Sequence, residues 1–166
     1  MFGGFCSGKT FLSRSLAKQL KIKALHLDDV FWFGAWQHIG MEELLGIAKT
    51  HTKNEQWIIE GNYEVIREYL WKSCTQVIYL DISPWIATWR ALKRCWSKQR
   101  QGVPLKVRES GCREPAIQLV KNIWWYYKKN RRDDLHFIDM ISNHQIQIAV
   151  IRNNKKYMEV LKQFRV

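Results

Sequence analysis

The chain has 166 residues, of which 46% are hydrophobic and 13% aromatic, so it can bury the core of one folded domain and is not intrinsically disordered. No apolar run approaches the ~18 residues of a transmembrane helix, and the N-terminus lacks the basic and apolar parts of a secretion signal. The four cysteines are scattered without zinc-type spacing, which is typical of reduced thiols. We therefore expect a cytoplasmic protein with no membrane partner.

The formal net charge is +12, and nearly all of this excess lies in one stretch of the chain. Residues 84–132 contain 13 Lys and Arg but only two acidic side chains, whereas the rest of the chain carries 14 basic and 13 acidic ones. Such a concentration favours a binding site for phosphates or nucleic acid, although a solvated basic surface has the same composition.

Short apolar runs alternate with longer amphipathic segments, which is the pattern of α/β proteins. Helices are predicted over residues 8–20, 41–52, 64–72, 84–100, 114–132 and 154–164, and strands over residues 24–27, 57–59, 76–82 and 146–151. A lid-like loop is predicted over residues 101–111. Because the strands are continuously apolar and lie between helices, they predict a parallel sheet buried on both faces. We expect one domain of residues 1–166, with a basic, lid-like segment at about 84–113.

The first helix is preceded by a complete phosphate-loop motif, G-x-x-x-x-G-K-[ST]. In such a loop the backbone N–H groups surround the phosphates, and the following helix directs the positive end of its dipole at them. The lysine reaches the terminal phosphates, and the hydroxyl of the last residue binds Mg²⁺. The residues predicted to bind a nucleotide are Gly3, Gly4, Phe5, Cys6, Ser7, Gly8, Lys9 and Thr10, with Thr10 also a metal ligand.

Two features of this loop are unusual. Cys6 occupies a position where many such loops carry glycine, which predicts local backbone strain. Only Met1 and Phe2 precede the loop, whereas a phosphate loop normally follows a strand at the centre of the sheet. We therefore expect the first strand to be largely missing from this chain.

A phosphate loop works with a carboxylate that holds Mg²⁺ or its waters, or that accepts a proton from the acceptor hydroxyl. Asp28, Glu60 and Asp81 each follow a predicted strand, and the carboxyl ends of parallel strands converge where ligands bind. Asp28 is predicted to be the acceptor-side base or a ligand of a metal-bound water, with a helix cap or turn residue as the alternative. Glu60 is predicted to be the metal-site carboxylate, with an ordinary strand-end residue as the alternative. Asp81 suits the start of a helix as well as catalysis. Asp29 is expected to face solvent, and His26 to be structural.

The basic segment begins with Arg90, Arg94 and Lys98, which share one face of a predicted helix. Like charges at this spacing repel one another, so a bound anion would relieve the repulsion. We predict that Arg90 and Arg94 clamp the transferred phosphoryl group, with a solvated helix face as the alternative. A second basic cluster is expected at a helix C-terminus, where cations suit the helix dipole. It consists of Lys128, Lys129, Arg131 and Arg132.

Several motifs occur in an order that is specific to one protein family. They are the phosphate loop, Leu27-Asp28-Asp29-Val30-Phe31-Trp32, Trp57-Ile58-Ile59-Glu60-Gly61-Asn62-Tyr63, Arg90 with Arg94, Trp124-Trp125-Tyr126-Tyr127 and Val150-Ile151-Arg152-Asn153. Over nearly its whole length, the sequence thereby resembles the adenylate-kinase-related P-loop NTPases known as DNA topology modulation proteins. It departs from them at Glu60, where the family usually has Asp, at Cys6, and in the short first strand.

The resemblance implies a three-layer α/β sandwich of the adenylate-kinase type, with a five-stranded parallel sheet. It also implies ATP and Mg²⁺ as cofactors and transfer of a phosphoryl group to a small-molecule or nucleotide acceptor. The catalytic residues would be Lys9, Asp28, Arg90 and Arg94, and Arg152 would contact the nucleotide. The acceptor side would be lined by Asp28, Trp32, Gly61, Asn62 and Tyr63.

Two alternative functions stay open at this point. The family name refers to an effect on DNA topology, so one alternative is a regulatory protein that binds nucleic acid through the basic segment and uses ATP only as a ligand. The other is a degenerate kinase homologue that has lost activity with its first strand.

Overall fold

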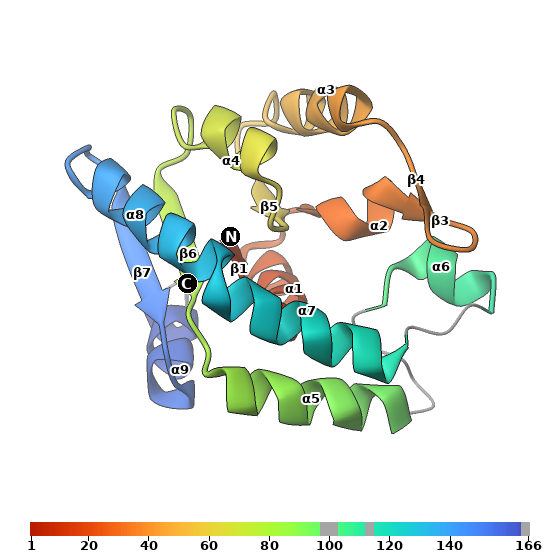
Figure 1. Ribbon diagram of the computed structural model, residues 1–166. Helices are drawn as coiled ribbons and strands as arrows, with labels where there is room; N and C mark the ends of the chain where they lie inside the picture. Colours follow the sequence, from red (N-terminus) through yellow and green to blue (C-terminus); the bar gives the residue numbers. More distant parts are fainter. Residues whose placement is uncertain (97–102, 112–114, 164–166) are drawn as a thin grey trace.

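The computed structural model describes residues 1–96, 103–111 and 115–163 and confirms an α/β fold with a parallel sheet (Figure 1). The parallel strands are β1 (Phe2–Gly3), β2 (Ala24–His26), β5 (Ile58–Glu60), β6 (Gln76–Leu80) and β7 (Gln147–Ile151). β6 pairs with β1 on one side and with β7 on the other, and β2 pairs with β5. These short apolar strands are separated by helices, which allows the parallel pairing.

The two groups of strands meet at Met1. Its α-amine donates a hydrogen bond to the carbonyl oxygen of Ile59 at 2.8 Å, and its carbonyl oxygen accepts one from the amide of Gly61 at 3.2 Å. These bonds place β1 between β5 and β6, so the strands follow the order β2, β5, β1, β6, β7. β1 has only two residues, in line with the expected shortness of the first strand.

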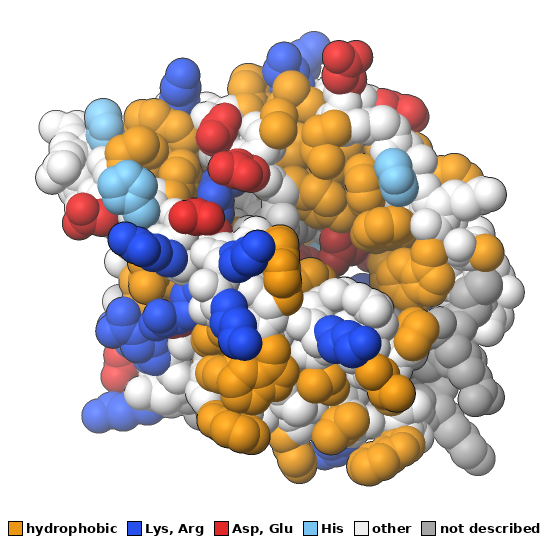
Figure 2. Space-filling view, in the orientation of Figure 1, with side chains coloured by type: hydrophobic (Ala, Val, Ile, Leu, Met, Phe, Trp, Pro, Cys, Tyr) orange, Lys and Arg blue, Asp and Glu red, His pale blue; other side chains and the backbone are white. Residues whose placement is uncertain are grey.

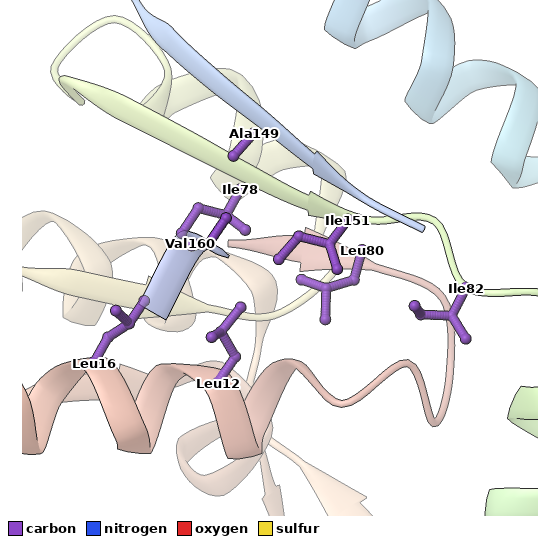
Figure 3. Close-up of a cluster of buried hydrophobic side chains, with 8 residues drawn as sticks. All are labelled: Leu12, Leu16, Ile78, Leu80, Ile82, Ala149, Ile151 and Val160. Atoms are coloured by element: carbon purple, nitrogen blue, oxygen red, sulfur yellow. The ribbon is translucent and has the colours of Figure 1, made fainter. Parts of the chain in front are cut away.

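Helices cover both faces of the sheet and make three layers. On one face, α1 (Lys9–Leu20) and α9 (Asn154–Gln163) pack on the core drawn in Figure 3. This core consists of Leu12, Leu16, Ile78, Leu80, Ile82, Ala149, Ile151 and Val160. The other face packs on α8 (Asn130–Ser142) through Phe2, Val77, Tyr79, Phe137 and Ile141. None of the helices in the described part of the chain is long and apolar enough to cross a membrane.

A further group of elements surrounds the ends of β2 and β5. α2 (Leu27–Phe31), α3 (Met41–His51) and α4 (Glu64–Leu70) enclose a core made by Leu27, Phe31, Leu44, Ala48, Ile59 and Ile66. The antiparallel pair of β3 (Trp32–Phe33) and β4 (Gln37–His38) follows α2. Neither α2 nor this pair is predicted from the sequence, because segments of two to five residues show no clear periodicity.

The basic segment contains a short helix that the sequence does not predict. α5 (Pro84–Trp96) begins at Pro84, as predicted, and packs on α7 (Ala116–Lys128) through Ala87, Ala91, Leu119 and Ile123. Residues 105–109 form α6 (Leu105–Glu109), whereas the sequence predicts a loop there. The start of that loop, and residues 97–100 of the predicted helix before it, lie outside the described residues.

The prediction of a single helix over residues 114–132 is wrong. α7 ends at Lys128 and α8 begins at Asn130, with Lys129 between them at φ −115° and ψ −66°. Arg131 and Arg132 therefore lie in the first turn of a helix instead of at a helix C-terminus. Residues 128–134 are all polar, so hydrophobic periodicity gives no signal at the break.

The α-amine of Met1 is buried inside the sheet. Burial lowers its pKa from 8.0 to about 6, because the protonated amine loses hydration that the negative charge of Glu60 only partly replaces. In the unfolded chain the amine binds a proton below about pH 8, whereas in the folded chain it does so only near pH 6. The unfolded state therefore holds more protons on this amine between these values, so the contribution of the amine to stability falls as the pH is lowered from 8 to 6.

We expect N-terminal acetylation to remove this part of the pH dependence. Between pH 8.5 and pH 6, the free energy of unfolding of the unmodified chain should fall by about 2 kcal/mol more than that of the acetylated chain. Urea denaturation of both forms at several pH values measures this difference. The same pH dependence in both forms would contradict a buried, neutral amine.

Candidate functional site

The phosphate loop passes closely between β6 and α7. A Cβ atom on Gly3 would lie 2.5 Å from the carbonyl oxygen of Leu80, and one on Gly4 would lie 2.6 Å from the ring of Tyr126. Real Cβ atoms do not approach other heavy atoms so closely, so glycine is required at both positions. Gly8, which precedes α1, has φ +100°, another conformation that favours glycine.

Cys6 has a left-handed backbone conformation with φ +53°. For a residue with a Cβ atom this conformation costs about 1–2 kcal/mol. The strain that the sequence predicts at this position is therefore present. The packing around the loop must stabilise this backbone conformation.

Two cationic side chains converge on the loop. The ammonium group of Lys9 donates a hydrogen bond to the carbonyl oxygen of Gly4 at 2.9 Å, and the guanidinium group of Arg90 donates one to the carbonyl oxygen of Ser7 at 2.8 Å. The Ser7 hydroxyl is buried and has no hydrogen-bond partner among the described residues. A loop with two nearby cations and an unsatisfied hydroxyl is suited to an anion that carries several oxygen atoms.

Glu60 lies at the end of β5 and is almost fully buried, with a relative exposure of 2%. Its Oε2 atom accepts hydrogen bonds from the Thr10 hydroxyl at 3.1 Å and from the His26 ring, whose Nδ1 atom is 3.0 Å away. Burial alone would raise the pKa of Glu60, but the hydrogen bond from His26 and the positive charge of Lys9 lower it below its usual value. Glu60 is therefore a buried carboxylate that is ionised at neutral pH.

The contact between His26 and Glu60 is not predicted from the sequence, which indicates only a structural role for His26. The two residues face each other in the parallel register of β2 and β5, and the Ser13 hydroxyl lies 3.4 Å from the same His26 nitrogen. Only the pairing of these two strands brings His26 and Glu60 together, and no local motif indicates that pairing.

Asp28 lies in α2, directly after β2, and its Oδ1 atom accepts a hydrogen bond from the Tyr63 hydroxyl at 2.6 Å. The residue keeps an exposed side, but the surrounding protein displaces enough water to raise the pKa of its carboxyl group. The bond from Tyr63 lowers this pKa, since it stabilises the ionised form, and the negative charge of Glu60 raises it. A carboxylate with a raised pKa and a fixed orientation is suited to accept a proton.

The other residues predicted on the acceptor side differ in what they contact. Trp32 packs at right angles to Phe31, with the ring centres 4.9 Å apart, and adjoins Trp36. Asn62 is exposed. Gly61 has φ +155°, and a Cβ atom there would lie 2.8 Å from the side chain of Leu27, so this glycine is required for packing on α2.

The basic segment contacts this side through α6. The amide of Leu105 donates a hydrogen bond to Oδ1 of Asp29 at 2.9 Å, and the Ser110 hydroxyl donates one to the carbonyl oxygen of Gly34 at 2.8 Å. The sequence predicts a solvated Asp29, whereas the structure gives this residue a specific contact. It holds the first residue of α6 next to α2.

Asp81, after β6, is held by two arginines. Arg131 donates two hydrogen bonds to its carboxylate at 2.7 and 2.9 Å, and Arg152 donates one at 3.2 Å. Burial alone would raise the pKa of Asp81, but these bonds and charges lower it. The structure thus places Arg152, predicted to contact the nucleotide, on the carboxylate of Asp81, and it gives Arg131 a specific partner instead of a solvated position.

The positive charge of the segment from residue 84 to 132 is spread over several surfaces. Arg90 reaches the phosphate loop, and Arg94, one turn further along α5, is half-buried. Lys98 lies outside the described residues. Figure 2 shows Lys and Arg side chains over α7 and α8, and a hollow between α7 and the layer of α2 to α4 with acidic side chains in its depth.

A metal site made of protein side chains alone is not present in the described part of the chain, where no group of three or more His, Cys, Asp or Glu is suitably placed. Mg²⁺ in phosphate-transfer sites needs only one or two protein ligands, because water and phosphate oxygens supply the others. Thr10 and Glu60, whose side chains are 3.1 Å apart, fit that requirement.

Comparison with known proteins supports the fold. No protein-family model matches the sequence, and no curated protein matches it. Among solved structures, shikimate kinase from Bacteroides thetaiotaomicron is similar, with 13% identity and a TM-score of 0.56 over 98% of this chain and 93% of the kinase. Deoxyadenosine kinase from M. mycoides, solved with bound dATP, has 16% identity and a TM-score of 0.40 over 98% of this chain and 95% of that chain.

The similarity to shikimate kinase, together with the parallel sheet and the phosphate loop before α1, leads to one conclusion about the fold. The chain has the α/β fold of P-loop kinases, as predicted from its sequence.

The close contact between the loop and Tyr126 predicts the effect of a single methyl group. Gly4→Ala should lower the free energy of unfolding by about 1–3 kcal/mol, because the ring of Tyr126 is buried and leaves no room for the added Cβ. Gly46→Ala is the matched control, since Gly46 lies within α3 and nothing lies within 4 Å of the place where its Cβ atom would be. That control should stabilise the chain by about 0.5–1 kcal/mol. Urea denaturation compares the two variants, and equal effects would contradict the packing of the loop on α7.

Proposed function

We propose that this protein is an ATP-dependent phosphotransferase that acts on a small-molecule or nucleotide acceptor. The observation that carries the proposal is that cations and carboxylates meet at the phosphate loop. Lys9 and Arg90 bond to its carbonyl oxygens, Glu60 accepts a hydrogen bond from Thr10 at its end, and the charge of Lys9 acts on both Glu60 and Asp28. We also propose a cytoplasmic location, where ATP is available as the phosphoryl donor.

The phosphates of ATP would be held by the backbone amides of residues 3–10 and by the N-terminus of α1. Lys9 and Arg90 donate hydrogen bonds to carbonyl oxygens of this loop. When ATP binds, these cationic groups can donate to phosphate oxygens instead. The Thr10 hydroxyl would hold Mg²⁺, with Glu60 directly or through a water molecule. When bound, Mg²⁺ neutralises charge on the phosphates.

Asp28 would accept the proton of the acceptor hydroxyl. Tyr63 fixes the orientation of this carboxylate, and desolvation gives it a raised pKa, which brings its basicity closer to that of a useful proton acceptor. Trp32 and Tyr63, which both contact Phe31, would form an aromatic wall for the acceptor. Asn62 is exposed on the same side and can donate or accept hydrogen bonds.

Arg90 and Arg94 would stabilise the negative charge of the transferred phosphoryl group. α6 carries Lys106 and Arg108 and is bound to Asp29 beside the acceptor side. This contact supports a lid role for the segment at about 84–113, in which α6 excludes water from the reacting groups.

The first experiment measures binding of ATP in the presence of Mg²⁺ by titration calorimetry. Lys9→Ala should weaken binding by about 10–100-fold, since it removes charge-assisted hydrogen bonds to the phosphates. Lys18→Ala is the control, because Lys18 is an exposed lysine of the same helix. Circular dichroism verifies that each variant is folded.

The outcome separates the proposal from its alternatives. A folded chain that does not bind MgATP, or that binds it equally well after Lys9→Ala, would contradict the proposed phosphotransferase activity. Binding without transfer to a panel of nucleosides, nucleoside monophosphates and hydroxy acids would favour the degenerate homologue. Salt-dependent binding of DNA that is insensitive to Lys9 would favour the nucleic-acid-binding alternative.

The pair of Tyr63 and Asp28 predicts a shift in the pH profile of transfer. The Tyr63 hydroxyl lowers the pKa of Asp28, so Tyr63→Phe should raise that pKa and move the acidic limb of kcat/KM to higher pH. Tyr69→Phe, which alters an exposed residue of α4, should leave the profile unchanged. Asp28→Asn should lower kcat by about 100- to 10,000-fold. An acidic limb at the same pH in the Tyr63→Phe variant would exclude Asp28 as its origin.

A further inference from the structure

His26 is a mostly buried polar residue to which the proposed reaction gives no role. It ends β2, and its side chain has a relative exposure of 14%. In the parallel register of β2 and β5 it lies opposite Glu60, and side chains at paired positions of neighbouring strands point to the same face of the sheet. That face is the one covered by α1, because Thr10 and Ser13 of this helix lie beside the pair.

The Nδ1 atom of His26 carries the hydrogen in this contact. Its partners among the described residues are Oε2 of Glu60 at 3.0 Å and Oγ of Ser13 at 3.4 Å. The Ser13 hydroxyl donates its own hydrogen to the carbonyl oxygen of Thr10 at 3.1 Å, so it presents only a lone pair to the ring. An ionised carboxylate likewise offers only lone pairs. Nδ1 is therefore the donor, and the shorter distance directs its hydrogen bond to Glu60.

Oε2 of Glu60 thus receives two hydrogen bonds, one from His26 and one from the Thr10 hydroxyl at 3.1 Å. The terminal torsion of a glutamate side chain varies widely when nothing restrains it. Two donors that come from different elements, β2 and α1, fix the plane of this carboxylate. Oε1 accepts no hydrogen bond from the described residues, so it is the oxygen left for a metal ion or for a water bound to one.

Thr10 alone would fix this carboxylate less well. Its hydroxyl rotates about a single bond, and in the proposed site the same oxygen binds Mg²⁺. The ring of His26 is a rigid donor on a strand, and its bond to Oε2 uses no atom that is proposed to bind the metal. Hydrogen bonds from neighbouring residues orient the groups that bind a metal, and their loss typically lowers metal affinity by about 10–100-fold.

We propose that His26 is a positioning residue for Mg²⁺, which fixes the carboxylate of Glu60 through the bond from Nδ1 and keeps Oε1 available to the metal or its water. This inference rests on the proposed function, in which Thr10 and Glu60 hold Mg²⁺. A purely structural His26 would only compensate the buried charge of Glu60, and its loss would weaken binding of ATP with and without Mg²⁺ alike.

The test measures how much Mg²⁺ strengthens the binding of ATP. Titration calorimetry gives the dissociation constant of ATP in Mg²⁺ and in EDTA, and the ratio of the two constants is the Mg²⁺ enhancement. In His26→Leu this enhancement should be about tenfold smaller than in the unmodified chain, because Oε2 loses its rigid donor. The affinity for ATP in EDTA should not change, since the carboxylate is needed for the metal and not for the phosphates.

Asparagine is the conservative replacement for this histidine. Its amide nitrogen is bonded to Cγ, as Nδ1 of histidine is, so His26→Asn can donate to Oε2 from the same position and should keep the enhancement within about threefold. In His26→Gln the amide lies one bond further from the backbone, so this variant should behave like His26→Leu and replaces it if His26→Leu does not fold. His136→Leu alters an exposed histidine of α8 and is the matched control.

Three results would overturn the inference and leave the phosphotransferase proposal intact. They are an enhancement in His26→Leu equal to that of the unmodified chain, an equal loss of ATP affinity with and without Mg²⁺, and a folded His26→Asn variant with no more enhancement than His26→Leu. An unmodified chain that binds ATP no better in Mg²⁺ than in EDTA would overturn the inference together with the proposed metal site. The failure of the positioning role is thereby distinguished from the failure of the site itself.

Discussion

The buried carboxylate of Glu60 is the interaction on which the site depends. A charge with 2% exposure is tolerated only if it is paired and hydrogen-bonded, and the partners of Glu60 come from separate parts of the fold. Thr10 belongs to the first turn of α1, and His26 ends β2. The requirement to satisfy one carboxylate therefore fixes the start of α1 against the ends of two neighbouring strands.

The phosphate loop is held from its other side by a buried polar network. The ring of Tyr126 contacts Gly4, and the Tyr126 hydroxyl donates a hydrogen bond to Asp134 and lies 3.2 Å from the hydroxyl of Tyr79. Asp134 in turn forms an ion pair with Arg67 of α4. This network links α4, α7 and α8 directly behind the loop, so the strained conformation of Cys6 is held between well-packed elements.

A structural feature can be predicted from the sequence when the residues that determine it lie in one continuous segment. The phosphate loop and β6 are continuous runs of residues, and the start of α5 is indicated by Pro84, so each follows from its own segment. The break at Lys129 and the short helix α2 lack such a signal. The contacts of Asp29 with Leu105 and of Asp81 with Arg131 join residues far apart in the chain, and a single sequence contains no information on which of its charges will meet.

The distribution of charge around the loop follows from these contacts. The excess of basic residues between positions 84 and 132 does not form one uniform surface, because Arg131 is held by Asp81, whereas Arg90 reaches the loop itself. The carboxylates of Asp28 and Glu60 lie at the ends of β2 and β5, where each is close enough to raise or lower the pKa of its neighbours. In the proposed reaction a phosphoryl group would leave a cationic loop and move to a hydroxyl whose proton is taken by the acidic side. Lys9 lies close enough to Glu60 for its charge to lower the pKa of that carboxyl group, so the cationic loop and the acidic side meet at the first turn of α1. The proposed transfer would take place there.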